Sequence, residues 1–211
     1  MKILVIDNYD SFTYNLVQYL KELSEDPIDV FRNDAITLDQ VAAYDFIVLS
    51  PGPGLPADAG IMPELIKQYA STKIIFGVCL GLQAIGEAFG GELHNLTQVF
   101  HGIETSIEII DRENHLFKEV PQGIKVGRYH SWVVKKDKLP EELKITAVDK
   151  EGMIMALQHK TYEVSGVQFH PESIMTEYGK EMLGNILENA KLKVEKESDS
   201  RVIIRPAGQG I

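Results

Sequence analysis

Short apolar runs alternate with helix-like segments through the first half of this chain, and this alternation restricts the fold more than any other feature. Strands separated by helices pair in parallel through right-handed crossovers, which places helices on both faces of an open sheet. In such sheets the ligand site lies beyond the carboxyl ends of the strands. The expected strands are residues 2–6, 28–31, 46–49 and 74–76, and the expected helices are 12–23, 38–43, 59–69 with Asp58 as N-cap, and 82–89.

From Gly91 onward the pattern changes to β-rich segments separated by turn signals such as residues 149–152. This change predicts antiparallel hairpins packed onto the parallel sheet. The expected fold class is therefore α/β: an open, mostly parallel twisted sheet with helices on both faces and a small antiparallel β extension. The expected strands of this half are residues 103–110, 125–129, 132–135, 144–148, 154–158 and 164–169.

A last helix is expected at residues 177–194. The composition favours one domain, residues 1–194, because 211 residues with 44% hydrophobic content can build one sizeable core. The polar segment 195–211 is expected to be a flexible tail.

Composition also restricts location and partners. A single cysteine cannot form an internal disulfide, which is typical of a reducing, cytoplasmic setting. The opening MKILVIDNYD does not read as a signal peptide, and no apolar run approaches the ~20 residues that a membrane span needs. The net charge of −10 argues against a nucleic-acid partner. We therefore expect a small molecule or another protein as the partner.

The single cysteine, Cys79, lies in GVCLGLQ between Gly77 and Gly81. Glycines at these positions allow a sharp backbone bend between the expected strand 74–76 and the expected helix 82–89. This arrangement predicts a nucleophile elbow, in which the N-terminus of the helix favours the thiolate. The alternative is a buried structural cysteine, and the motif alone does not separate the two.

The segment PGPGLPA, residues 51–57, follows the expected strand 46–49. It formally matches a dinucleotide-binding fingerprint, but Pro53 and Pro56 remove backbone donors and no acidic residue follows about 20 positions later. The segment is better interpreted as a rigid loop that presents the Gly54 N–H to an incoming oxygen. In isolation, however, an ordinary strand-to-helix connection is the preferred interpretation of this loop.

The segment GVQFHPES, residues 166–173, carries His170 and Glu172 at the end of an apolar strand. Residues i and i+2 of an extended chain face the same side, so the carboxylate can lie beside the imidazole. A Cys–His pair needs this arrangement, although a strand-end histidine beside a surface glutamate is the commoner case. The other histidines have no metal-ligand spacing, so no metal site is expected.

A nucleophile elbow, a donor loop and a His-x-Glu pair are together the parts of a covalent acyl-transfer site. At these residues the chain resembles the class I (triad) glutamine amidotransferases, and within them the small subunits of anthranilate synthase and aminodeoxychorismate synthase. The opening DNYDSFTYN is what narrows the resemblance to this chorismate-using branch. The resemblance rests on IDNYDSFTYNLVQYL (6–20), SPGPG (50–54), GVCLGLQAIGEAFGG (77–91), GRYHS (127–131) and GVQFHPES (166–173).

The resemblance implies that Cys79 attacks the side-chain amide of glutamine, forms a γ-glutamyl thioester and releases ammonia. His170 would take the thiol proton and give it to the leaving ammonia, and Glu172 would orient His170. The backbone N–H groups of Gly54 and Leu80 would hold the oxyanion. No metal or nucleotide cofactor is implied. The residues implied to line the glutamine pocket are Gly52, Pro53, Gly54, Gln83, Ser131 and Trp132, with Gln83 at the α-amino acid end.

The resemblance also implies a partner, the large subunit of a chorismate-using synthase, with residues 8–11 and 128–130 as contact candidates. Anthranilate for tryptophan is the favoured product, and 4-amino-4-deoxychorismate for folate is the alternative. A stand-alone cysteine hydrolase of γ-glutamyl compounds and a non-catalytic binding subunit stay open as rivals. The chain departs from the family pattern at Leu82, where many members have histidine.

Overall fold

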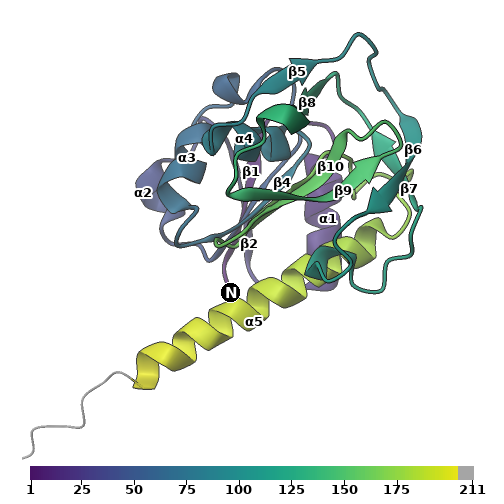
Figure 1. Ribbon diagram of the computed structural model, residues 1–211. Helices are drawn as coiled ribbons and strands as arrows, with labels where there is room; N and C mark the ends of the chain where they lie inside the picture. Colours follow the sequence, from purple (N-terminus) through teal and green to yellow (C-terminus); the bar gives the residue numbers. More distant parts are fainter. Residues whose placement is uncertain (204–211) are drawn as a thin grey trace, which may run out of the picture.

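The computed structural model describes residues 1–203, and within them nine strands form one sheet (Figure 1). These strands are β1 (Ile3–Asp7), β2 (Ile28–Arg32), β3 (Phe46–Leu49), β4 (Ile74–Val78), β6 (Ile103–Ile109), β7 (Lys125–Arg128), β9 (Leu143–Asp149), β10 (Ile154–His159) and β11 (Val164–Val167). Their order is β2-β1-β3-β4-β11-β10-β9-β6-β7. Strands β5 (Leu93–Asn95) and β8 (Trp132–Val134) pair separately as a two-stranded antiparallel sheet.

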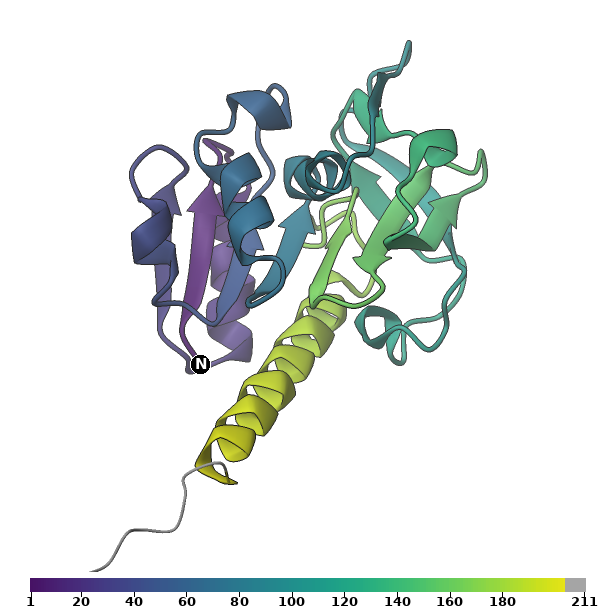
Figure 2. The ribbon, with the colours of Figure 1, turned by 60° about the vertical axis from the view of Figure 1, so that its left-hand side comes forward.

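The sheet has a parallel half and an antiparallel half, which lie beside each other in Figure 2. Strands β2, β1, β3, β4 and β11 pair in parallel, whereas β11, β10, β9, β6 and β7 pair antiparallel. The predicted fold class is confirmed. The antiparallel strands extend the parallel sheet edge to edge instead of packing onto it, because β10 takes up the free hydrogen-bonding edge of β11.

Helices cover both faces of the parallel half. In β1, Ile3 and Val5 contribute to one core with residues of α1 (Thr13–Leu23) and α5 (Gly179–Ile203). Leu4 and Ile6 contribute to a second core with residues of α3 (Met62–Tyr69) and α4 (Leu80–Ala88). The alternation of strand side chains thus supplies an apolar surface to each helical layer. A short helix, α2 (Leu38–Val41), begins at a Thr37 capping box.

Several helix boundaries differ from the sequence-based expectations. Helix α3 begins at Met62, so Asp58 is not its N-cap but ends the 3-10 turn Pro56–Asp58. Gly60, at φ +53°, separates this 3-10 turn from α3. Pro63 lies in the first turn of α3, where its missing N–H costs no helical hydrogen bond. Helix α4 begins at Leu80, directly after the cysteine.

Helix α5 continues to Ile203, past its expected end at residue 194. Residues 195–203 are therefore helical where a flexible tail was expected, and in both views this end of α5 extends past the sheet. The segment begins with Glu195, Lys196 and Glu197, residue types that lose little rotamer freedom in a helix. The rest of the predicted tail, 204–211, lies outside the described residues. Among residues 1–203, no helix is both long and apolar enough to cross a membrane.

Candidate active site

Cys79 lies at a sharp bend between β4 and α4. Its backbone has φ 52° and ψ −98°, in the left-handed half of the map that residues with a Cβ rarely occupy. Two backbone hydrogen bonds hold this conformation: the Cys79 N–H donates to the Val167 carbonyl at 2.8 Å, and the Gln83 N–H donates to the Cys79 carbonyl at 3.1 Å. The surrounding fold thus maintains a strained backbone at the thiol, a feature that clusters at functional sites.

The two glycines around Cys79 are needed because other backbone segments approach them closely. A Cβ on Gly77 would lie 2.4 Å from the Gly81 carbonyl carbon, and a Cβ on Gly81 would lie 2.6 Å from the Leu49 carbonyl oxygen. Real Cβ atoms essentially never come this close. The glycine spacing in the sequence therefore predicted a bend that the structure contains.

His170 and Glu172 follow β11, which is the parallel neighbour of β4. Nδ1 of His170 lies 2.8 Å from Oε1 of Glu172, and each side chain is at most 2% exposed. Nε2 of His170 is buried and has no hydrogen-bond partner among the described residues, so it is free to exchange a proton with a reacting group. Burial lowers the pKa of His170, but its interactions with Cys79 and Glu172 outweigh burial and raise that pKa well above its usual value.

Two aromatic rings enclose the imidazole of His170. The Phe12 ring centroid lies 5.3 Å from it and the Tyr129 ring centroid 4.9 Å, both in edge-to-face arrangements. Phe12 immediately precedes α1 and Tyr129 immediately follows β7, so both halves of the sheet contribute. Phe12 lies within the motif at residues 6–20, but nothing in its local pattern indicated this contact.

Gln168 is a polar neighbour of the thiol that sequence analysis did not identify. Its Nε2 donates a hydrogen bond to Cys79 Sγ at 3.5 Å, and the residue has no exposed surface. Residues i and i+2 of an extended chain face the same side, so the expected strand 164–169 would place Gln168 on the side that bears His170. Applied one step earlier in the motif, this rule would have found Gln168.

The loop expected to donate to the oxyanion lies against the elbow. A Cβ on Gly52 would lie 2.8 Å from Cδ2 of Leu80 and 2.6 Å from Cβ of Asn8. Gly54 has φ +76° and is exposed, and Leu80 is the first residue of α4, where backbone N–H groups are free of helical partners. The two expected donor segments are therefore neighbours.

Gln83, which was expected in the glutamine pocket, is buried, and both of its side-chain N–H groups are engaged in hydrogen bonds within the protein. Its Nε2 donates to the Trp132 carbonyl at 2.8 Å and to Gln168 Oε1 at 3.3 Å. Ser131 and Trp132 are both half-buried, and the Ser131 carbonyl accepts from the Leu96 N–H at 2.7 Å. Only the Oε1 atom of Gln83 remains to accept a hydrogen bond from a substrate.

Of the two segments expected to contact a partner, residues 128–130 are largely internal, whereas in residues 8–11 only Asn8 is buried. Asn8 is 2% exposed, Arg128 has no exposed surface and His130 is 6% exposed, so these side chains are not available to another protein. Tyr9, at 51% exposure, is available. Leu82 is fully buried in the core between the sheet and α3 and α4, where an apolar side chain has no desolvation cost.

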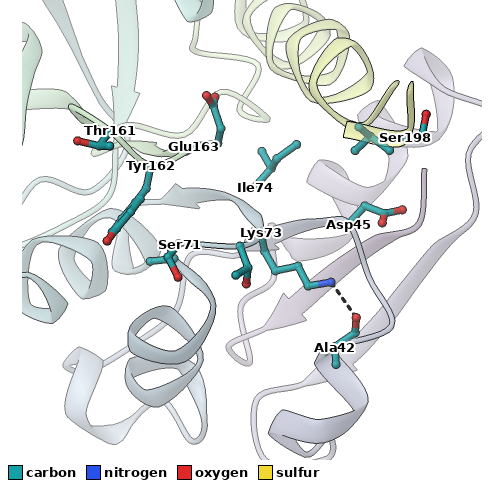
Figure 3. A pocket seen from close by; sticks show the side chains of 12 residues that line it. Ala42, Asp45, Ser71, Lys73, Ile74, Thr161, Tyr162, Glu163 and Ser198 are labelled. Atoms are coloured by element: carbon teal, nitrogen blue, oxygen red, sulfur yellow. Dashed lines mark hydrogen bonds between the residues drawn. The ribbon is translucent and has the colours of Figure 1, made fainter. Parts of the chain in front are cut away.

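A surface pocket of about 700 Å³ lies at the amino ends of the parallel strands (Figure 3). Its lining includes Asp45, Ile74 and Glu163, which stand at or just before the first residues of β3, β4 and β11. Lys73 in this pocket donates to the Ala42 carbonyl at 2.7 Å. The thiol and the imidazole lie after the carboxyl ends of the same strands, so this pocket is not part of their site.

Comparisons with known proteins identify relatives of this chain. The family described as glutamine amidotransferase class-I matches residues 4–190. A Bacillus subtilis protein named aminodeoxychorismate/anthranilate synthase component 2 is 49% identical over 198 residues, 91% of this chain and 98% of its own. Anthranilate synthase component 2 of Pseudomonas aeruginosa is 47% identical over 192 residues, 88% and 94% of the two chains. A solved structure from Thermoplasma acidophilum, described as a GMP synthase subunit, has a TM-score of 0.84 at 25% identity, covering 94% of this chain and 98% of its own.

Proposed function

The chain belongs to the class-I glutamine amidotransferases, and on this premise we propose that it is the glutaminase subunit of an anthranilate synthase. It would hydrolyse L-glutamine and deliver the ammonia to a chorismate-binding large subunit for tryptophan synthesis. The observation that carries the proposal is the strained Cys79 elbow beside the buried His170–Glu172 pair. The single unpaired cysteine fits a cytoplasmic location.

The first half of the reaction forms the thioester. His170, whose pKa is raised, takes the proton of the Cys79 thiol, and the sulfur attacks the side-chain carbonyl carbon of glutamine. The backbone N–H groups of Gly54 and Leu80 stabilise the negative charge that develops on the carbonyl oxygen. His170 then protonates the amide nitrogen, the C–N bond breaks, and ammonia leaves.

The second half regenerates the enzyme. Neutral His170 takes a proton from water, the hydroxide equivalent attacks the thioester carbon, and the C–S bond breaks to release glutamate and the Cys79 thiolate. The proton stays on Nε2 of His170 and restores the imidazolium. Glu172 holds Nδ1–H throughout, which sets the tautomer and stabilises the positive charge.

The glutamine would lie between the loop after β3 and the strand β8. Gly52, Pro53 and Gly54 would form one wall, and Ser131 and Trp132, at the start of β8, would form the other. Gln83 would accept a hydrogen bond from the α-ammonium group through its remaining Oε1. This role is narrower than the one the sequence suggested, since its N–H groups are already engaged.

The alternative is the same chemistry in an aminodeoxychorismate synthase, and the name of the B. subtilis relative includes both products. Glutaminase activity measured with each purified large subunit, for the native chain and for Cys79→Ser, separates the proposals. A large rise with the anthranilate synthase subunit, absent in Cys79→Ser, supports the tryptophan assignment. A rise only with the other subunit overturns it. High activity of the isolated chain, unaffected by either subunit, indicates a stand-alone hydrolase instead.

A further inference from the structure

A continuous series of hydrogen bonds connects the antiparallel half of the sheet to the thiol. Gln168 Nε2 donates to Cys79 Sγ at 3.5 Å, and Gln168 Oε1 accepts from Gln83 Nε2 at 3.3 Å. Gln83 Nε2 also donates to the Trp132 carbonyl at 2.8 Å. Nδ1 of His130 lies 3.0 Å from that same carbonyl oxygen. These contacts bring together residues from α4, β8 and the loop after β11.

The chemistry of the carbonyl determines the orientation of every group in the series. The Trp132 carbonyl can only accept, so both His130 Nδ1 and Gln83 Nε2 must be donors. The second N–H of Gln83 then points at Gln168, which must present its oxygen. The amide nitrogen of Gln168 is left facing Sγ, and a flipped Gln168 amide would put two donors together and leave the sulfur without one.

The far end of the series is fixed by a buried ion pair. Arg128 Nε donates to Nε2 of His130 at 3.0 Å, and Arg128 Nη1 donates to Asp149 at 2.8 Å. The guanidinium carbon also lies 3.6 Å from the centre of the Phe100 ring. Burial, and then the charge of Arg128, lower the pKa of His130 to about 3, so His130 stays neutral with its proton on Nδ1.

From this arrangement we infer that Gln168 is a further catalytic residue, which donates a hydrogen bond to the Cys79 sulfur and holds it in its attacking position. The series from Gln83 to Asp149 acts as the positioning support for this amide. A hydrogen bond to an anionic sulfur is stronger than one to a neutral thioester sulfur. Gln168 therefore contributes most when the thiolate attacks and when it leaves. The identity of the substrate in these steps rests on the proposed function, whereas the contact between Gln168 and the thiol does not.

Alkylation by iodoacetamide tests the inference without any substrate, because Cys79 is the only cysteine in the chain. In Gln168→Leu the sulfur loses its donor, and we expect the alkylation rate at pH 7 to fall about 10-fold, with the pH–rate profile displaced to higher pH. Gln168→Glu keeps the acceptor for Gln83 but places a carboxylate beside the sulfur, so we expect a larger fall.

Gln158→Leu is the matched control. Gln158 accepts a hydrogen bond from Asn114 at 2.7 Å, away from the thiol, and the variant should keep the native alkylation profile. Far-UV circular dichroism and thermal unfolding test whether the variants are folded. If Gln168→Leu does not fold, Gln168→Glu tests the inference in its place.

Unchanged alkylation in a folded Gln168 variant overturns the inference, whatever the glutaminase activity. A changed alkylation profile, in a protein that shows no glutaminase activity with either large subunit, supports the role of Gln168 and instead contradicts the proposed function. The two ideas therefore fail separately.

Discussion

Arg128 and Asp149 form an ion pair of 2.8 Å in which neither side chain has any exposed surface. Oδ1 of Asp149 also accepts from the backbone N–H groups of Glu151 at 3.1 Å and Met153 at 2.8 Å, so the carboxylate closes the turn between β9 and β10 as well. Buried ions of this kind are stable only while each keeps its partner, because the desolvation cost is not recovered otherwise. The pair thus couples the folding of the antiparallel half to the support of the thiol.

Asp149→Ala should therefore lower the free energy of unfolding by about 3–5 kcal/mol, because it leaves the Arg128 guanidinium buried and uncompensated. Urea denaturation followed by circular dichroism measures this loss. Glu104→Ala is the control: its ion pair with Lys125, at 3.7 Å, is largely exposed and should contribute less than about 1 kcal/mol. Equal losses in the two variants would contradict the importance of burial.

His130 makes stability depend on pH below neutrality. Its pKa of about 3 in the folded protein is far below the value of about 6.5 expected in the unfolded chain. Between these values the unfolded state binds a proton that the native state does not, so stability falls as the pH drops from 6.5 toward 3, by about 1.4 kcal/mol for each unit. His170 has a raised pKa, so its contribution is complete below pH 6.5 and is lost only at higher pH.

His130→Gln should flatten this slope, and unfolding free energies at several pH values between 4 and 7 would reveal it. His94→Gln replaces an exposed histidine of β5 and should keep the native slope. A slope that stays unchanged in His130→Gln would assign the acid sensitivity to other groups.

Glu172→Gln should reduce kcat for glutamine hydrolysis about 10²–10⁴-fold and leave KM nearly unchanged. The neutral amide cannot stabilise the imidazolium of His170 and can present a donor instead of an acceptor to Nδ1. Steady-state kinetics in the presence of the large subunit measure both constants. Glu177→Gln, the same change at a carboxylate that accepts from the Lys125 N–H, should keep the native kcat. If Glu172→Gln keeps kcat within about 3-fold, the orienting role is wrong.

Gly81→Ala should destabilise the protein by about 1–3 kcal/mol and slow the alkylation of Cys79, because its Cβ would meet the Leu49 carbonyl oxygen at 2.6 Å. Gly184→Ala provides the contrast within helix α5. Its Cβ would meet only Cδ2 of Leu23 at 3.6 Å, so we expect a gain of about 0.5–1 kcal/mol from helix propensity. Thermal unfolding compares the two, and a stable Gly81→Ala would show that the backbone at the elbow can shift.

Local patterns were sufficient to predict the first strands of the parallel half, but not that β11 joins them, since residues 164–169 were expected in an antiparallel hairpin. The alternation of strands and helices identified β1 to β4, and the glycines around Cys79 predicted its bend. The His170–Glu172 contact was predicted from the alternation of an extended chain, but the structure makes it in a turn, in which the Ser173 N–H donates to the His170 carbonyl at 3.1 Å. Helix ends were harder to predict from the sequence: α3 starts later than expected because of Gly60 and Pro63.

The sequence by itself therefore determined which side chains share a face of a strand and where the backbone must bend, because these properties depend on neighbours a few residues apart. The tertiary structure alone decided which strands became neighbours. Gln168 reaches Cys79, 89 residues earlier in the chain, only because β11 pairs with β4. Arg128 reaches Asp149 only because the antiparallel strands continue the sheet and bury both charges. Periodicity specifies the face that a side chain occupies, but not the partner it meets there.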